Sequence, residues 1–484
     1  MKKIKPIFII AVLVLLLIPG LVSGSHNVSE NLGKILPLWS FIPFIGMLLS
    51  IALFPLFKPH WWEKNLFNVA IVWSLVFLVP FAIGYGPYEA GHSFYEIIAL
   101  DYLPFIVLLL GLFTVSGGIV LKGSLTGSPK VNLILLIVGT LLASWVGTTG
   151  ASMLMIRPVL RANAWRGKKA HVIVFFIFLV SNIGGCLTPI GDPPLFLGFL
   201  RGVPFFWTLQ LAPLLLFNAV ILLVVFFLLD RSLYKKDIAA GLKPPEVVQK
   251  EPLRVEGLQN IIFIAMIVGA VILAGILSTL DSFKTSSGDV IGIPLAYGLS
   301  LPIPTVIEML IILLAVFLSL RITRKEHHEL NNFSWGPIKE VACLFVGIFI
   351  TMIPALAILH ARGAELGLTE PWQFFWASGA LSSFLDNAPT YLVFMTTASA
   401  IPTTAGLTTT IGVIAPKLLL AVSAGAVFMG ANTYIGNAPN FMVRSIAEEN
   451  SVKMPSFFGY MGWAGRVLIP LFVLDTLVFF VFFK

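Results

Sequence analysis

Long apolar runs alternate with short polar loops along most of the chain. A helix needs about 20 apolar residues to cross the hydrocarbon core of a bilayer, and the uninterrupted runs are close to that length. They span residues 38–57, 66–84, 99–121, 207–229, 257–280, 304–320, 338–360 and 457–483. The pattern therefore predicts an all-α polytopic membrane protein.

Two further apolar segments, 170–200 and 412–445, are interrupted by motifs that resemble each other. The first motif is Thr188-Pro-Ile-Gly-Asp192-Pro-Pro194 and the second is Thr433-Tyr-Ile-Gly-Asn437-Ala-Pro439. Glycine and proline leave main-chain groups without helical partners, and in a bilayer such gaps persist only where protein or a wet cavity covers them. We predict two broken transmembrane helices. Paired breaks in the two halves of a membrane chain indicate the binding site of a secondary transporter.

The apolar stretches 131–160 and 372–400 are each broken at the middle, by Gly147-Thr-Thr-Gly-Ala-Ser152 and by Asp386-Asn-Ala-Pro-Thr390. Each half is too short to span a bilayer. We therefore predict two re-entrant hairpins, each of which returns to the side from which it entered.

The distribution of basic residues supports the hairpins. With both hairpins re-entrant, most lysines and arginines fall in loops on one side, as the positive-inside rule requires. A single span over residues 131–160 would instead place the basic cluster Arg157–Lys169 outside. We expect a multi-pass protein of the cell (inner or plasma) membrane.

Composition agrees with this class. Hydrophobic residues make up 58% of the 484 residues and charged residues only 11%, about half of the charged fraction of soluble domains. The net charge of +8 does not indicate nucleic-acid binding, because the basic residues are spread over loops. Cys186 and Cys343 lie inside apolar segments, so neither a disulfide framework nor a zinc site is expected. No cofactor is expected beyond transported or coupling Na⁺ and H⁺.

Residues 1–24 fit two interpretations. Lysines precede a short apolar run that ends in small residues, which is typical of a signal peptide. The same residues can form a first transmembrane helix, which we favour. The N-terminus is then cytoplasmic.

The order of segments predicts two halves of opposite orientation. Gly111-Leu-Phe113 parallels Gly347-Ile-Phe349, Ser144 parallels Ser383, and the two breaks follow in the same order, so we predict an inverted-topology repeat. The predicted divisions are N-terminal scaffold helices (25–98), repeat 1 (99–229), a cytoplasmic linker (230–256), further scaffold helices (257–337), and repeat 2 with the last helix (338–484).

Two carboxylates fall at the breaks, Asp192 in the first broken helix and Asp386 at the second hairpin tip. An ionisable group at membrane depth costs roughly 2.5–3.5 kcal/mol on insertion scales, so both are functional candidates. The polar residues around the breaks are Asn182, Thr188, Thr148, Thr149, Ser152, Asn387, Thr390, Asn432, Thr433 and Asn437. Hydroxyl, amide and free carbonyl oxygens suit Na⁺, and a buried carboxylate suits exchange of a proton for a cation.

A structural interpretation competes with each of these assignments. Asn and Thr at helix breaks often cap free main-chain groups. Asp192 precedes Pro193-Pro194 and could be a helix N-cap, and Asp386 could cap the second half of its hairpin. Capping and ion binding are compatible, because the end of a half-helix is itself a polar site. Asp101, Glu308 and His171 lie near segment ends, so we expect them at the interface or edge.

At these residues the sequence resembles a known family. Ser181-Asn-Ile-Gly-Gly185 followed by Thr-Pro-Ile-Gly-Asp192 resembles the signature of NhaD-type sodium/proton antiporters. Phe384-Leu-Asp-Asn-Ala-Pro389 resembles the hairpin tip of the ion transporter superfamily, which includes arsenite permeases and CitMHS-type citrate carriers. The resemblance covers roughly residues 99–200 and 338–445.

The resemblance implies a homodimer in which a transport domain moves like an elevator against a scaffold domain. It also implies sodium or proton coupling at the hairpin tips. The residues that would carry this coupling here are Asn182, Thr188, Asp192, Ser383, Asp386, Asn387, Asn432 and Asn437. The first hairpin departs from the antiporter pattern, because Gly147-Thr148 stands where those proteins carry an Asp-Asn pair.

Three functions remain open, and the first is our prediction. It is Na⁺(Li⁺)/H⁺ antiport, in which the cation and the proton compete for Asp192 and Asp386. The alternative is a Na⁺- or H⁺-coupled carrier of citrate or another organic anion, with Arg157 or Arg444 assisting. A remote alternative is an intramembrane aspartyl enzyme built on the same acid pair, but it leaves the inverted repeat unexplained.

Overall fold

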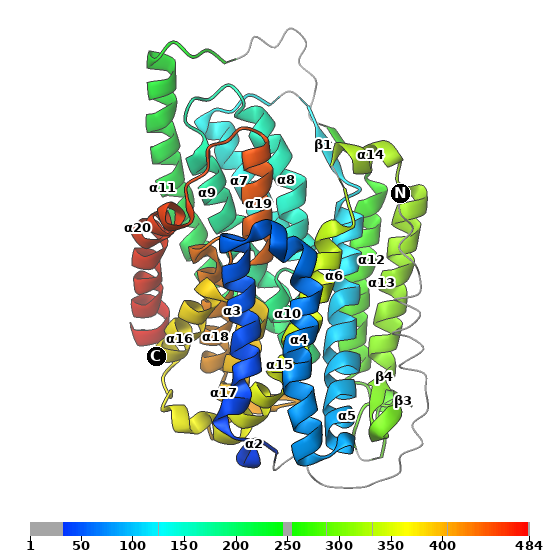
Figure 1. Ribbon diagram of the computed structural model, residues 1–484. Coiled ribbons are helices and arrows are strands. Elements are labelled where there is room, and N and C mark those ends of the chain that lie inside the picture. The colour runs from blue at the N-terminus through cyan, green and yellow to red at the C-terminus, as the bar shows by residue number, and fades with distance from the viewer. Residues whose placement is uncertain are drawn as a thin grey trace.

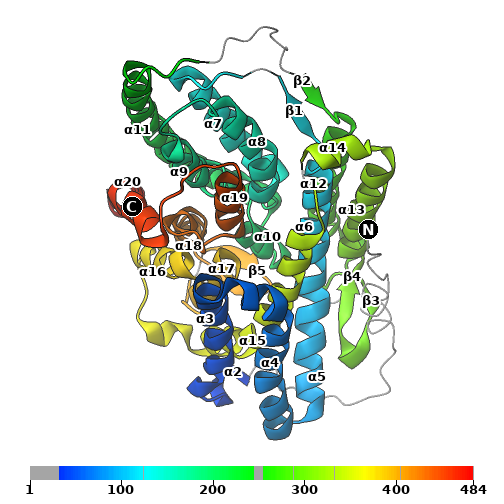
Figure 2. The same cartoon turned by 45° about the horizontal axis from the view of Figure 1, so that its top comes forward.

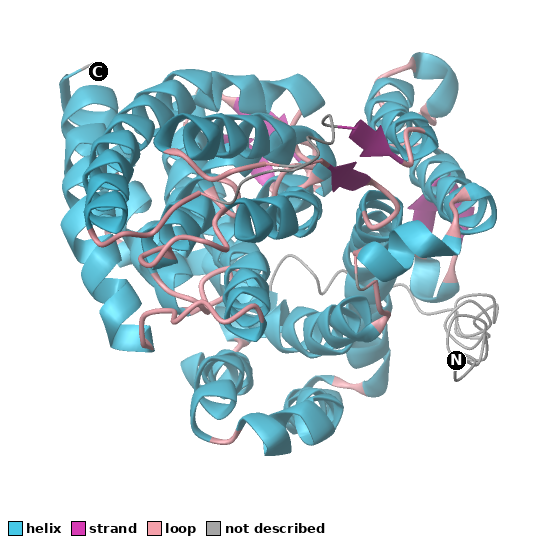
Figure 3. Cartoon of the chain, turned by 90° about the horizontal axis from the view of Figure 1, so that it is seen from above, coloured by secondary structure: helices cyan, strands magenta, loops and turns pink. Residues whose placement is uncertain are grey.

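The computed structural model describes residues 32–482 except 124, 245–253, 287, 332 and 404. The segment 1–24, for which we predicted a signal peptide or a first helix, lies outside the described residues. Within the described part, ten helices are long and apolar enough to cross a membrane. This confirms the prediction of an all-α polytopic membrane protein. Figure 3 shows how little of the chain is not helical.

Most long helices agree with the uninterrupted apolar runs, but the spans Pro87–Ser116 and Phe205–Ala239 extend well beyond the predicted 99–121 and 207–229. The helices of the N-terminal part are α2 (Leu32–Ile35), α3 (Ile42–Phe57), α4 (Pro59–Tyr85), α5 (Pro87–Glu96) and α6 (Leu103–Ser116). The middle of the chain forms α11 (Ala212–Ala239), α12 (Gln259–Leu277), α13 (Ile303–Ile322), α14 (Lys325–Leu330) and α15 (Gly336–Arg362). The chain ends in α20 (Phe457–Asp475) and a π-helical continuation, Thr476–Phe482.

One half of the first hairpin, Pro129–Val146, is long and apolar enough to cross a membrane, contrary to our expectation that each half is too short. The four interrupted segments form pairs of helices. These are α7 (Pro129–Val146), α8 (Thr148–Ala162), α9 (Ala170–Leu179), α10 (Pro193–Leu200), α16 (Pro371–Phe384), α17 (Asn387–Ser399), α18 (Pro416–Met429) and α19 (Ala438–Glu449). In Figure 1, α7, α8, α9 and α19 occupy the upper half of the molecule, and α10, α16, α17 and α18 the lower half. The breaks therefore lie near the middle.

Three pairs of short antiparallel strands connect helix ends. They are β1 (Val120–Lys122) with β2 (Arg254–Glu256), β3 (Gly292–Pro294) with β4 (Ser300–Pro302), and β5 (Leu407–Thr409) with β6 (Gly412–Ile414). In the first pair, Val120 lies opposite Glu256 and Lys122 opposite Arg254. This pair joins the end of α6 to the chain just before α12.

Burial separates the central helices from those at the periphery. Residues Ile173–Leu179 of α9 are almost completely inaccessible, whereas α4 and α11 carry large apolar side chains on their outer faces. Exposed apolar faces of this length are what a helix presents to lipid. The residues of the first break, from Asn182 to Asp192, are almost all buried in the protein, and Figure 2 shows α9 and α10 between other helices.

Candidate functional site

The first hairpin consists of α7 and α8, which turn back on each other at Gly147. Gly147 has a φ of +78°, a conformation that costs an L side chain energy but not glycine. At the open end, the Gly127 amide donates to the Ala162 carbonyl (2.7 Å), and the side-chain amides of Asn132 and Asn163 exchange hydrogen bonds of 2.9 and 2.7 Å. The start of α7 therefore lies beside the end of α8, and Gly147 forms the tip between them.

The second hairpin consists of α16 and α17. Pro371 opens α16, and the Gln373 side chain accepts from the Glu370 amide (3.0 Å), as in a capping box. At the tip, Asp386 is the N-cap of α17, and its Oδ1 accepts from the Ala388 amide (3.0 Å). The capping interpretation of Asp386 is therefore correct, although one carboxylate oxygen takes no part in the cap.

The tip of the first hairpin packs against the first break. The Thr188 hydroxyl donates to the Ser144 carbonyl, and the Thr148 amide donates to the Gly191 carbonyl (2.8 Å). A Cβ on Gly191 would collide with the main chain of Gly185, so only glycine fits at this position. These contacts fix the main chain immediately before Asp192.

The second break meets its hairpin in the same way. The Thr433 hydroxyl donates to the Ser383 carbonyl (2.5 Å), and the Asn432 side chain donates to the Ser383 hydroxyl (2.9 Å). A Cβ on Gly436 would collide with the Gly430 carbonyl oxygen. Asn437 comes directly after Gly436 and directly before α19, at the position that corresponds to Asp192, 245 residues earlier.

Asp192 is the point at which these segments meet. Its side chain is 1% exposed and accepts three hydrogen bonds. The donors are Thr148 Oγ1 (2.8 Å) and Asn437 Nδ2 (3.1 Å) to Oδ1, and Asn387 Nδ2 (2.6 Å) to Oδ2. Asp192 occupies the N-cap position of α10, but its side chain makes no capping hydrogen bond. The carboxylate instead joins both hairpin tips to the second break.

The hairpins also pack against the broken helices of the other half. α8 contacts α19, and α17 contacts α10, while α16 lies along α18 and α7 along the turn Ile183–Leu187 (Figures 1 and 2). The Asp192 crossing therefore depends on contacts between segments that are far apart in the sequence.

A second layer of amides supports the crossing. Asn437 Nδ2 also lies within 3.1 Å of the Ser181 carbonyl and 3.2 Å of Asn182 Oδ1. Asn182 Nδ2 donates to Asn440 Oδ1 (2.7 Å), and Asn440 Nδ2 donates to the carbonyls of Gly430 and Thr433 (2.8 and 2.9 Å). Asn440 was not among the residues that we predicted from the sequence. Its position three residues after Asn437, on the same face of α19, was the available signal.

Two amide oxygens near the crossing are buried without a partner. Oδ1 of Asn387 and Oδ1 of Asn432 accept no hydrogen bond from any described residue. Both amides use their nitrogen, toward Asp192 and Ser383 respectively. An unpaired buried acceptor costs about 1–3 kcal/mol, and an amide oxygen is a hard ligand suited to a small cation.

The remaining predicted residues are dispersed. Thr149 is half-buried in the first turn of α8, away from the Asp192 hydrogen bonds. Thr390 donates to the Asp386 carbonyl (2.9 Å) within α17, and Ser152 is 2.8 Å from the Ser181 hydroxyl. In the part of the chain that the structure describes, no three His, Cys, Asp or Glu side chains are grouped to hold a metal ion. A cation site here would depend on amide and main-chain oxygens beside a carboxylate.

Residues that we expected at an edge or interface are buried in the protein. Asp101 accepts from Arg201 Nη2 (2.5 Å), and one oxygen of Glu308 has no described partner. His171 is 3% exposed, and its Nε2 lies 2.9 Å from Asp230 Oδ1. The reason is that neighbouring helices cover these positions, which the hydropathy of a single segment does not reveal.

An ionic cluster at the base of the first hairpin also escaped the sequence analysis. Arg166 donates to Asp230 (2.9 Å) and to Asp237 (2.6 Å), both on α11. Asn132 of α7 donates to Asp230 as well (2.9 Å). The acidic members Asp230 and Asp237 lie in the charged last turns of α11, in the segment 230–256 that we predicted as a cytoplasmic linker, so the sequence did not indicate that they are buried.

Comparison with known families agrees with the transporter architecture. A family model with the description "Putative citrate transport" (CitMHS_2) matches residues 33–480. No curated protein matches the chain.

Proposed function

The chain belongs to this family of transporters, and we propose that it is a secondary transporter whose coupling cation, Na⁺ or H⁺, binds at Asp192. Membership of a transporter family excludes the aspartyl-enzyme alternative. The chain is a multi-pass membrane protein with lipid around its apolar helices. Its location in the cell (inner or plasma) membrane, with the basic loops and the N-terminus cytoplasmic, is part of the proposal and follows from the positive-inside rule.

One observation carries the proposal. Asp192 is a buried carboxylate at the junction of both hairpin tips. Nearby, the amide oxygen of Asn387 at the second hairpin tip and that of Asn432 at the second break have no partner among the described residues. None of the ion pairs in the described part of the chain involves Asp192. A buried carboxylate without a cationic partner favours binding of a cation from solution.

Competition at this carboxylate would couple the two ions. Thr148, Asn387 and Asn437 donate to Asp192, so they favour its ionised, cation-binding form. Protonation removes the charge that attracts Na⁺. Proton and Na⁺ are then bound alternately, and the transporter carries Na⁺(Li⁺) in exchange for H⁺.

The paired geometry supports alternating access by an inverted repeat. Thr188 donates to the Ser144 carbonyl in one half, and Thr433 donates to the Ser383 carbonyl in the other. We propose that both hairpins are re-entrant and move together with the breaks, as an elevator-type transport domain. The remaining helices would form the scaffold and the interface of a homodimer.

A second candidate is cation-coupled transport of citrate or another organic anion, and the family description favours it. Because no lysine or arginine pairs with Asp192, the substrate carboxylates would be held by the N-termini of α10 and α19 and by hairpin amides. The cation at Asp192 would then drive uptake rather than exchange with protons.

Proteoliposomes that contain a pH-sensitive dye separate the two candidates. If the protein is an antiporter, Na⁺ or Li⁺ added outside, without any organic anion, enters in exchange for luminal protons, so the lumen should become more alkaline. If Na⁺ moves no protons and radiolabelled citrate enters only when Na⁺ or H⁺ drives it, antiport is wrong. If Asp192→Asn retains full activity in both assays, the cation site itself is wrong.

A further inference from the structure

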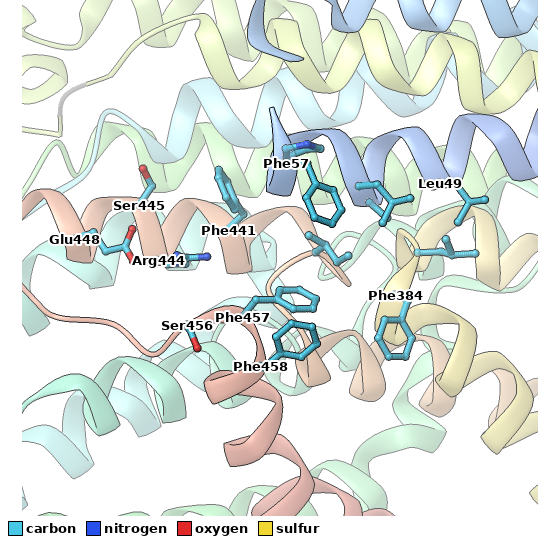
Figure 4. A pocket seen from close by; sticks show the side chains of 15 residues that line it. Leu49, Phe57, Phe384, Phe441, Arg444, Ser445, Glu448, Ser456, Phe457 and Phe458 are labelled. Carbon is cyan, nitrogen blue, oxygen red and sulfur yellow. Dashed lines mark hydrogen bonds and ion pairs between the residues drawn. The ribbon is translucent and has the colours of Figure 1, made fainter. Parts of the chain in front are cut away.

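A cavity of about 790 Å³ lies between α3, the tip of the second hairpin, the second break, α19 and the start of α20 (Figure 4). This volume is within the range of small-molecule sites in proteins. The hydrogen bonds around Asp192 do not involve any residue that lines it. It is therefore a separate site beside the proposed transport site.

The walls of the cavity are almost wholly apolar, and its opening faces the surroundings of the protein. Aliphatic and aromatic side chains of α3 form one wall, and Phe457 and Phe458 form another. Phe57 and Phe458, at the opening, are 76% and 79% exposed. On a helix bundle with apolar outer faces, such side chains contact acyl chains rather than water.

Polar groups gather at one end of the cavity. Figure 4 shows Arg444, Glu448, Ser445 and Ser456 together, away from Leu49 and Phe384 at the opposite end. Arg444 Nε donates to Glu448 Oε1 (3.0 Å), and the Arg444 guanidinium lies over the buried ring of Tyr434. Both charged side chains remain partly exposed, at 23% and 44%. The cavity is thus amphipathic along its length.

We propose that this cavity binds one membrane phospholipid with a zwitterionic, primary-amine headgroup, of the phosphatidylethanolamine class. The planar guanidinium of Arg444 suits the phosphate, and the Glu448 carboxylate suits the ammonium group. One acyl chain lies against the apolar walls toward Phe384. Arg444 and Glu448 carry opposite unit charges, so the complementary ligand carries both signs as well.

The lining argues against a tricarboxylate in this cavity. A citrate would lose its hydration among aromatic side chains, with Arg444 as the one basic residue among those that line the cavity. Each carboxylate that is buried in an apolar environment without a partner costs roughly several kcal/mol. An amphiphile with a long apolar tail meets no such penalty.

Two of the residues that line the cavity adjoin the transport site. Leu385 lines the cavity and directly precedes Asp386, and Ile435 lines it two residues before Asn437. A bound acyl chain therefore packs against both the hairpin tip and the break that contact Asp192. We expect the lipid to stabilise the association of the hairpin tip with the break. The effect of the lipid on transport rests on the proposed function, but the binding of the lipid does not depend on it.

Lipid retention by the purified full-length protein tests the proposal. The protein is equilibrated in micelles with equal amounts of phosphatidylethanolamine and phosphatidylcholine, and bound lipid is counted by native mass spectrometry. We expect at least a fivefold preference for phosphatidylethanolamine. Glu448→Gln should abolish the preference, because it removes the partner of the ammonium group. Ala52→Trp, which fills the cavity from α3, should abolish retention of either lipid.

Arg321→Gln is the matched control. Arg321 also stacks on an aromatic ring, Phe317, near the end of a helix, but it lies outside the cavity. The Arg321→Gln variant should keep the same preference for phosphatidylethanolamine as the unchanged protein. Glu448 is partly exposed at the end of α19, so its variant is expected to fold even if Ala52→Trp does not.

Three results would overturn the proposal. They are equal retention of the two lipids by the unchanged protein, an unchanged preference in Glu448→Gln, and release of the bound lipid by citrate at concentrations that saturate transport. Because the readout is bound lipid, failure here leaves the Asp192 cation site untouched, and failure of cation transport leaves lipid binding untouched.

Discussion

The side-chain amide of Asn387 donates a hydrogen bond of 2.6 Å to the carboxylate of Asp192, across 195 residues of the chain. Asn387 begins the second half of one hairpin, and Asp192 ends the break in the other half of the molecule. The bond joins the hairpin tip to the proposed cation site, so movement of the tip changes the coordination of the carboxylate.

Substitution of Asn387 is expected to weaken cation binding. In Asn387→Ala, Asp192 loses its shortest donor and the site loses an unpartnered amide oxygen. Loss of such a partner costs about 1–3 kcal/mol, so the half-saturating Na⁺ concentration should rise roughly 5- to 150-fold in proteoliposomes. Asn450→Ala, at the end of α19, is the control and should leave that concentration unchanged. An unchanged value in Asn387→Ala would exclude this amide from the site.

The two acids are expected to respond differently to substitution. Asp192→Asn should abolish Na⁺-dependent proton movement, because it removes the carboxylate on which the donors of both hairpin tips converge. Asp386→Asn should retain most of the activity, because asparagine caps helices about as well as aspartate, whereas Asp386→Ala should lose about 1 kcal/mol of stability. Flux and the apparent Tm of each variant separate these effects. Loss of flux in Asp386→Asn at an unchanged Tm would instead make Asp386 a cation ligand.

The ion pair between Asp101 and Arg201 is expected to hold the π-helical turn Ile97–Tyr102 against the end of α10. The Nη2 to Oδ2 distance is 2.5 Å. Each single substitution, Asp101→Asn or Arg201→Gln, should lower stability by about 1.5–3 kcal/mol, as for a hydrogen bond to a charged group. The exchanged pair Asp101→Arg with Arg201→Asp should recover part of the apparent Tm. No recovery would mean that each residue acts independently of the other.

The ionic cluster of Arg166 is expected to fix the base of the first hairpin. Arg166→Leu leaves Asp230 and Asp237 buried without their cation, which should cost about 3–5 kcal/mol. The apparent Tm in detergent measures the loss. Lys168→Leu, in the same loop but exposed, should change it little. Equal Tm values for the two variants would show that the cluster does not stabilise the hairpin.

The pairing of β1 with β2 is expected to depend on pH. The Lys122 ammonium, 2.9 Å from Glu256, lowers the pKa of that carboxyl below its usual range. A lowered folded-state pKa stabilises the pairing above the unfolded-state pKa, and this contribution is lost as pH falls through the folded-state pKa. Hydrogen exchange of residues 120–122 should therefore accelerate only as pH falls below the usual glutamate pKa of 4.5, beyond the intrinsic pH effect. Lys122→Met should abolish this extra change.

Much of the architecture was determined by the sequence itself. The lengths of the apolar runs predicted most of the spanning helices, because the thickness of a bilayer sets the length of a helix. The spans Pro87–Ser116 and Phe205–Ala239 extend well beyond the predicted runs 99–121 and 207–229. Glycine and proline likewise marked the four interruptions, because their effects on the main chain are local. Gly147 is the clearest case, since it has a φ of +78° at the hairpin turn, a conformation that glycine adopts without steric cost.

The tertiary structure decided which side chains meet. Asp192 and Asp386 looked alike in the sequence, as acids at breaks, but Asp386 caps α17 while Asp192 accepts from both hairpins. Local pattern cannot distinguish these roles, because the donors to Asp192 come from segments that only packing brings together. Asn440 and Arg166 escaped notice for the same reason, since their partners lie on other helices.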